Sequence, residues 1–278
     1  MTMAWKSLLV HVDDAPSCRS RLDVAVRLAR DFAAGLVGVY LVRGTTVTPS
    51  GAALLPPDVA AARLDSLSDA QNDAEAAFRA QAAEAGIRDV SWRAPTGAVD
   101  DAMVLAARCS DLAILSQQDP NAGGTDTFAS TVILGCGRPT LVVPYIGAPS
   151  DFGERVLVAW DGGREATRAV ADAMPLLVRA RQVDVISVDN DNDDDVPERL
   201  SVARLAGWLA AHGVHAQIDR QESGNVGIGE WLLSRVADLQ SSLVVMGGYG
   251  HARLRELVLG GATRTMLRSM TIPVLFSH

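Results

Sequence analysis

The chain has 278 residues, of which 48% are hydrophobic and 21% are charged, and its formal net charge is −8. The hydrophobic content excludes a chain that is disordered over most of its length, and the length predicts two domains of about 100–150 residues each. The acidic balance argues against nucleic-acid binding and against binding to an anionic membrane, since both need a basic surface.

Neither a membrane span nor a disulfide framework is predicted. Apolar runs stay shorter than the roughly 18 residues of a membrane-spanning helix. The first residues lack the apolar core of a signal peptide, so we expect a cytoplasmic protein with no membrane contact. The cysteines are odd in number and far apart, and we expect buried hydrophobic roles for Cys18, Cys109 and Cys136.

In the first half, short runs of Val, Ile and Leu alternate with longer helical patterns. The strands predicted there are residues 7–12, 36–42, 111–116 and 138–143. After the second of these strands, we expect a loop over residues 45–57, followed by a long Ala-rich helix from Asp58 to Ala85.

The second half repeats this order, and self-similarity of this kind indicates two copies of one architecture. Its predicted strands are residues 155–160, 183–188, 242–247 and 272–276. A helix over residues 198–213 places Leu205, Trp208 and Leu209 on one face and ends at Gly213. The turn-rich segment 147–151 is the natural linker, which gives predicted domains over residues 1–148 and 152–278.

Apolar strands that alternate with helices are typical of a parallel sheet covered on both faces. We therefore predict two tandem, doubly wound α/β domains with parallel sheets. Ligands of such sheets bind at the carboxyl ends of the strands, where the strand order reverses. The residues that end predicted strands there are Asp13, Ser116, Asp161 and Gly247.

A glycine-rich loop follows the fourth strand of the second half. Gly247, Gly250, Gly260 and Gly261 permit positive φ angles and let backbone N–H groups approach an anion. A helix that begins near Gly261 would add the positive end of its dipole. The alternative is a set of tight turns that bind no ligand.

Positive charge gathers around the same loop. Arg253, Arg255, Arg264 and Arg268 share this stretch with a single acid, Glu256, which predicts attraction of phosphate groups. The alternative is that Arg264 and Arg268, four residues apart, form one solvated helix face.

The first half lacks the loop. Asp119 and Pro120 stand near the positions of the first two glycines, where a carboxylate repels phosphate and a proline offers no N–H donor. We therefore predict that the first domain binds no nucleotide and has a structural role.

The spacing of Gly247, Gly250 and Gly260 resembles the universal stress protein signature, which is Gly, two residues, Gly, nine residues, then Gly followed by Ser or Thr. Gly261 departs from this pattern, but Thr263 could supply a hydroxyl. The resemblance implies Rossmann-like domains of the adenine nucleotide alpha hydrolase type that bind ATP, or AMP or ADP, with Mg²⁺. It also implies Asp161 near the adenosine and the backbone around Val188 lining the base pocket.

The candidate cofactor-binding residues form one set around this loop and the ends of the first two strands of the second half. They are Asp161, Val188, Met246, Gly247, Gly250, His251, Arg253, Gly260, Gly261, Ala262 and Thr263. The function implied by the resemblance is that of a tandem universal stress protein, a regulatory stress-response protein rather than a committed enzyme. By the same resemblance the closing strands of the two halves pair in an intramolecular pseudo-dimer, and a further homodimer stays open.

Three alternatives stay open beside this interpretation. A ligand-free structural stress-response dimer is favoured by Gly261 and the degenerate first half. An enzyme of the ATP pyrophosphatase type, or a slow ATPase, would use the turn Asp161-Gly162-Gly163, which lacks the flanking serines of that phosphate loop. Metal binding by His212 and His215 lacks a third ligand nearby in sequence, so we assign no metal ligands and no catalytic residues.

Overall fold

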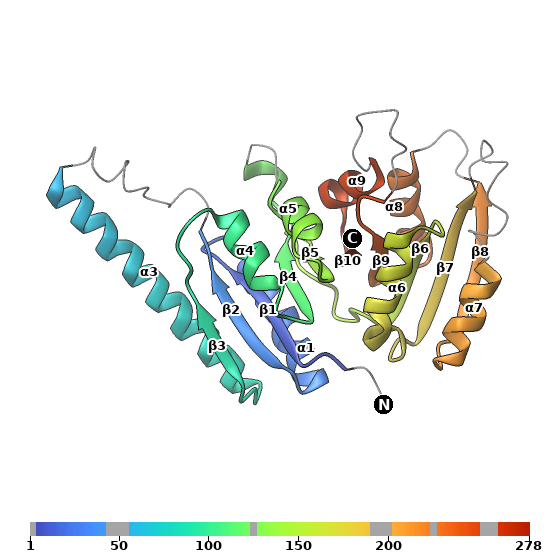
Figure 1. The fold of residues 1–278 in the computed structure, drawn as a ribbon, viewed down its shortest axis with the longest axis horizontal. Helices are drawn as coiled ribbons and strands as arrows, with labels where there is room; N and C mark the ends of the chain where they lie inside the picture. The colour runs from blue at the N-terminus through green and yellow to red at the C-terminus, as the bar shows by residue number, and fades with distance from the viewer. Residues whose placement is uncertain (1–3, 43–55, 123–126, 190–201, 223–226, 251–260) are drawn as a thin grey trace. The chain divides into compact units, whose positions relative to one another are not determined.

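The computed structural model describes residues 4–42, 56–122, 127–189, 202–222, 227–250 and 261–278 (Figure 1). These form two compact units, Trp5–Ile114 and Leu115–His278, which we call the amino-terminal and carboxy-terminal units. The division of the sequence into repeats over residues 1–148 and 152–278 stays a prediction. The loop predicted over residues 45–57 lies largely outside the described residues.

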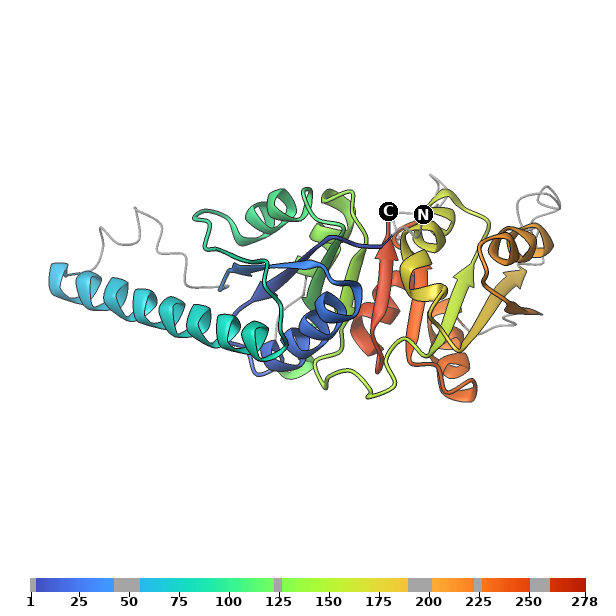
Figure 2. The same ribbon diagram turned by 90° about the horizontal axis from the view of Figure 1, so that it is seen from below.

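The amino-terminal unit is a parallel sheet with strand order β3-β2-β1-β4. Figure 2 shows α1 and α3 on one face of this sheet and α4 on the other. Its elements are β1 (Ser7–Val12), α1 (Cys18–Phe32), β2 (Gly35–Tyr40), α3 (Pro57–Glu84), β3 (Val90–Arg93), α4 (Val99–Ala107) and β4 (Leu112–Ser116), whose last two residues belong to the other unit.

The carboxy-terminal unit has the strand order β5-β10-β9-β6-β7-β8, and all its strands except β5 run parallel. Here α6 and α7 cover one face, and α8 and α9 cover the other (Figure 2). The elements are a 3-10 turn (Pro120–Ala122), α5 (Phe128–Gly135), β5 (Thr140–Val143), β6 (Arg155–Trp160), α6 (Arg164–Leu177), β7 (Gln182–Asp189), α7 (Val202–Ala211), β8 (Ala216–Glu222), α8 (Ile228–Asp238), β9 (Leu243–Gly247), α9 (Gly261–Ser269) and β10 (Val274–Ser277).

These arrangements confirm the predicted doubly wound α/β fold. The inner strands are buried on both faces because the crossover helices cover them. The side chains of Val156, Leu157 and Val158 in β6 are fully buried, as are Leu243, Val244 and Val245 in β9. This buried core holds the strand ends that carry the candidate site in fixed positions.

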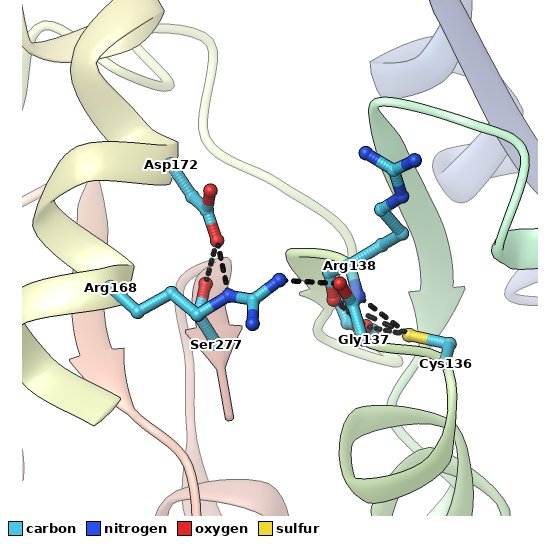
Figure 3. Close-up of polar contacts among 7 residues, drawn as sticks. Cys136, Gly137, Arg138, Arg168, Asp172 and Ser277 are labelled. Carbon is cyan, nitrogen blue, oxygen red and sulfur yellow. Dashed lines mark hydrogen bonds and ion pairs between the residues drawn. The ribbon is translucent and has the colours of Figure 1, made fainter. Parts of the chain in front are cut away.

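The two closing strands of the sequence repeat pair with each other, as predicted. β10 lies antiparallel to β5, with Leu275 opposite Leu141 and Phe276 opposite Thr140. The contact is reinforced by Arg168 of α6, whose guanidinium donates a hydrogen bond to the carbonyl of Gly137 in the turn before β5 (Figure 3).

The same guanidinium is held in place by an acid on its own helix. Arg168 Nε lies 3.5 Å from Asp172 Oδ2, and that oxygen also accepts a 2.9 Å hydrogen bond from Ser277 of β10 (Figure 3). A chain of polar contacts therefore joins α6, β10 and the turn that leads into β5.

On the helix face predicted to carry Leu205, Trp208 and Leu209, the two leucines are buried. The side chain of Trp208 is 40% exposed and lies against His212, with ring centroids 4.3 Å apart and planes tilted by 39°. The expected burial of Cys109 is wrong, since this residue is exposed, whereas Cys18 and Cys136 are buried as expected. Among the helices that the structure describes, none combines the length and hydropathy needed to cross a membrane.

Candidate functional site

The strand order of the carboxy-terminal unit reverses at β6, since the chain goes from β6 to β7 on one side and returns to β9 on the other. Register places Trp160 of β6 opposite Ser187 of β7, and Ala159 of β6 opposite Met246 of β9. The carboxyl ends of these three strands therefore bring together Asp161, Val188 and Gly247. The strand ends predict this place for Asp161 and Gly247, and the resemblance implies it for Val188.

Asp161 shapes the turn between β6 and α6. Its side chain is exposed, and its Oδ1 accepts a 2.8 Å hydrogen bond from the N–H of Gly163. Gly162 between them has a φ of +71°, which a glycine adopts without strain. The turn fixes one carboxylate oxygen of Asp161 and ends where α6 begins at Arg164.

Gly247 is required by packing at this point. A Cβ at this position would lie 2.7 Å from the backbone nitrogen of Ala166 and 2.9 Å from the backbone carbonyl carbon of Glu165. Neither backbone atom can move without shifting the first turn of α6, so only glycine lets β9 end this close to the helix.

Gly250 lies beside two carboxylates. A Cβ built on it would be 3.3 Å from Oε2 of Glu165 and 3.7 Å from Oδ2 of Asp161. Gly247 and Gly250 do not use the positive φ that glycine permits. The left-handed residue in the described part of this loop is Tyr249, with a φ of +55°. Sequence patterns did not point to Tyr249 or to Glu165.

Tyr249 is held in this conformation by hydrogen bonds at both ends. Its backbone N–H donates to Oγ1 of Thr263 at 3.0 Å, and its phenolic hydroxyl donates to Ser130 of α5. Thr263 is 3% exposed and lies in the first turn of α9. The hydroxyl predicted to face a ligand thus also anchors the start of the loop.

The end of the loop leads into α9, which begins at Gly261 as predicted. A Cβ on Gly261 would meet no atom of the described residues within 4 Å, and Ala262 beside it is half-buried. Arg264 and Arg268 are exposed on this helix. His251, Arg253 and Gly260, together with Arg255 and Glu256, lie outside the described residues.

Several buried polar atoms at this end of the unit have no hydrogen-bond partner among the residues that the structure describes. They include Nε1 of Trp160, Oγ of Ser187 and Oε2 of Glu165. Buried polar groups in proteins are nearly always paired, so orphaned ones call for a ligand, an ion or water. Three of them at neighbouring strand and helix ends mark this region as a candidate binding site.

The corresponding end of β1 in the amino-terminal unit is closed by its own side chains. Arg21 of α1, 1% exposed, reaches Oδ1 of Asp13 with its Nη2 at 2.8 Å and donates from Nε to the carbonyl of His11. Nε2 of His11 is hydrogen-bonded to the carbonyl of Leu41 at 2.7 Å, and its Nδ1 lies 3.6 Å from Oδ2 of Asp13.

This cluster sets the charge state of Asp13. Burial by itself raises the pKa of the carboxyl, but the charges of Arg21 and His11, with hydrogen bonds from Arg21 and the Ala15 N–H, outweigh it and hold the pKa below its ordinary value. Asp13 is therefore ionised and internally paired at neutral pH.

Leu41 is the counterpart of Val188 in the other half. Tyr40 of β2 lies opposite Val12 of β1, just as Ser187 of β7 lies opposite Trp160 of β6. Leu41 and Val188 are the residues that follow Tyr40 and Ser187. The backbone position that the resemblance assigns to base recognition is thus bonded to His11 in the amino-terminal unit.

Comparison with known proteins agrees with the fold. The universal stress protein family model matches residues 153–278. A universal stress protein, Slr1230, from Synechocystis sp. (strain ATCC 27184 / PCC 6803 / Kazusa) is 25% identical over 210 residues, which cover 69% of this chain and 66% of the relative, just under two thirds of its length.

Two solved structures share the fold over nearly the whole chain. A universal stress protein from Archaeoglobus fulgidus DSM 4304 matches with a TM-score of 0.75 at 14% identity, covering 98% of this chain and 97% of that one. A protein of unknown function from Pseudomonas aeruginosa PAO1 matches with a TM-score of 0.63 at 16% identity, covering 99% and 92%. Residues 153–278 therefore match the universal stress protein family, and the whole chain shares its fold with these solved structures.

Proposed function

We propose that this chain is a universal stress protein that binds an adenine nucleotide, ATP with Mg²⁺, at the carboxyl ends of β6, β7 and β9, and acts as a cytoplasmic regulatory protein rather than a committed enzyme. The observation that carries the proposal is the convergence at the reversal of strand order. There the Asp161 carboxylate lies beside Gly250 of the glycine loop, and the backbone of Val188 lies near the end of the neighbouring strand.

The amino-terminal half is proposed to be a second, degenerate copy that binds no nucleotide. Asp13 is neutralised by Arg21, and the Leu41 carbonyl is bonded to His11, so a nucleotide would have to displace buried, charge-assisted hydrogen bonds. The pairing of β5 with β10 supports the proposed pseudo-dimer of the two copies.

One observation favours a second candidate, a stress-response protein that holds no ligand. The oxygens Oε2 of Glu165 and Oδ2 of Asp161 both face Gly250, so negative charge already stands where phosphates are proposed to bind. Without a counter-ion these carboxylates would repel a nucleotide.

Two experiments distinguish a nucleotide-binding protein from a ligand-free one. The first is calorimetric titration with Mg²⁺-ATP, and the second is a search for nucleotide released when freshly purified protein is heat-denatured. The proposal expects saturable binding to the parent protein and its loss in Gly250→Val, whose methyl groups would fill the space between the carboxylates and the phosphates. Gly207→Val is the matched control, because a Cβ on Gly207 in α7 meets no described atom within 4 Å.

Absence of binding to the parent protein would favour the ligand-free candidate. Binding to a folded Gly250→Val variant with the parent's affinity would instead place the nucleotide elsewhere in the molecule.

A further inference from the structure

Two carboxylates at the start of α6 direct one oxygen each toward the same point. Oδ1 of Asp161 is taken by the Gly163 N–H, and Oε1 of Glu165 pairs with Arg164 at 3.0 Å. The remaining oxygens, Oδ2 of Asp161 and Oε2 of Glu165, both lie within 4 Å of the point where a Cβ of Gly250 would stand. The glycine leaves that point open.

Burial of the Glu165 carboxylate is unfavourable unless a ligand or ion binds to it. Glu165 is 5% exposed, and among the described residues its Oε2 has no hydrogen-bond partner. A buried carboxylate oxygen without a partner loses its hydration, and the neighbouring Asp161 adds repulsion between like charges. A cation held between these two oxygens, in the space beside Gly250, would relieve both effects.

We propose that Oε2 of Glu165 and Oδ2 of Asp161 hold a divalent cation that also binds the phosphates of the nucleotide. The inference rests on the proposed nucleotide site. Mg²⁺ in proteins is commonly bound by one or two carboxylates together with substrate phosphates and water, and two carboxylate oxygens beside a phosphate loop supply that set. Glu165 is thereby assigned a role that the glycine spacing does not reveal.

The proposal fixes how nucleotide binding depends on the metal. With the cation present, the two carboxylates join the phosphates to the protein. Without it, the same two carboxylates repel them, so chelation of the metal weakens binding by more than the loss of one contact. Replacing Glu165 by Gln reduces the difference in nucleotide affinity with and without the metal. The change removes a metal ligand, which weakens binding when the metal is present, and it removes repulsion, which strengthens binding when the metal is absent.

The first experiment tests the metal alone, using electron paramagnetic resonance of Mn²⁺ added to the full chain. One bound Mn²⁺ per chain is expected, weakened about tenfold or more in Glu165→Gln and in Asp161→Asn. Glu154→Gln serves as the matched control, since Glu154 is exposed and precedes β6, at the opposite end of that strand from Asp161. Asp161→Asn keeps the test valid if Glu165→Gln fails to fold, because Asp161 is exposed and asparagine can still accept the Gly163 N–H.

The second experiment compares ATP affinity in Mg²⁺ and in EDTA by calorimetry. We expect a ratio of about tenfold or more in the parent and in Glu154→Gln, and a clearly smaller ratio in Glu165→Gln. Equal ATP affinity in Mg²⁺ and EDTA, or an unchanged ratio in Glu165→Gln, overturns the cation site and leaves the proposed function standing. Mn²⁺ binding that depends on Glu165 in a protein that binds no ATP supports the cation site and overturns the proposed function. If the parent protein binds neither Mn²⁺ nor ATP, both the cation site and the proposed function are overturned.

Discussion

Gly247 shows that a glycine of the loop can be needed for close packing rather than for a positive backbone φ angle. The end of β9 touches the backbone of α6 at Ala166 and Glu165, and a methyl group at Gly247 would overlap both. We expect Gly247→Ala to lower the free energy of unfolding by about 1–3 kcal/mol, the usual cost of overpacking. Urea unfolding followed by circular dichroism measures this, and a change below about 0.5 kcal/mol would contradict the packing role.

Gly261 is the opposite case, because a Cβ there, at the first residue of α9, meets no atom of the described residues within 4 Å. Gly261→Ser should leave stability unchanged and restore the hydroxyl of the family pattern. One added hydrogen bond to a phosphate predicts an ATP affinity raised by about three- to tenfold in calorimetry. Weaker binding in this variant would mean that the phosphates do not approach the start of α9.

Asp13 gives the amino-terminal unit a predictable response to acid. Its pKa is lower in the folded protein than the ordinary value, so the ionised form stabilises the fold above about pH 4, and this stabilisation is lost as pH falls through the folded pKa. Between about pH 5 and pH 3 the free energy of unfolding should fall more steeply in the parent than in Asp13→Asn. Urea titrations at a series of pH values test this, and parallel curves for the two proteins would contradict it.

At the scale of elements, Tyr249 connects three parts of the carboxy-terminal unit. It leaves β9 with a left-handed φ, its N–H bonds to Thr263 of α9, and its hydroxyl bonds to Ser130 of α5. In a double-mutant cycle, Tyr249→Phe and Ser130→Ala should each cost about 0.5–1.5 kcal/mol of unfolding free energy, and the double variant should cost less than their sum. Strict additivity would show that the two hydroxyls do not interact.

The strands that could be predicted are those buried on both faces. The runs over 7–12 and 155–160 predicted the bounds of β1 and β6 because most of their side chains are apolar. β3 and β8 were not predicted. Both are the outermost strands of their sheets, β3 alternates half-buried with exposed residues, and Ala216–Glu222 is mainly polar.

The same limit applies to the candidate site. Asp161, Gly247 and Gly250 were predicted because strand ends and glycine spacing are visible along the chain. Glu165 and Tyr249 were not, since their roles depend on which atoms the fold brings near them. Ser130 is 119 residues from Tyr249, and no local pattern reports a contact of that kind.

For the whole molecule, the unequal ends of β1 and β6 predict one nucleotide per chain. The buried pairing of Asp13 with Arg21 and the bond from His11 to Leu41 close the first site. The second site retains buried polar atoms that have no hydrogen-bond partner within the described part of the chain. Calorimetry with Mg²⁺-ATP should therefore give a stoichiometry near one. Two equivalent sites per chain would contradict the assignment of the first half as nucleotide-free.

The antiparallel contact of β10 with β5 also determines how the second half would behave if expressed without the first. In a fragment of residues 152–278, β10 keeps β9 on one side and loses Thr140–Val143 on the other. The backbone groups of Val274–Ser277 would then form an open sheet edge, a template for pairing with another chain. Such a fragment should self-associate through β10, and a charged residue placed by Leu275→Lys should suppress that association in light scattering.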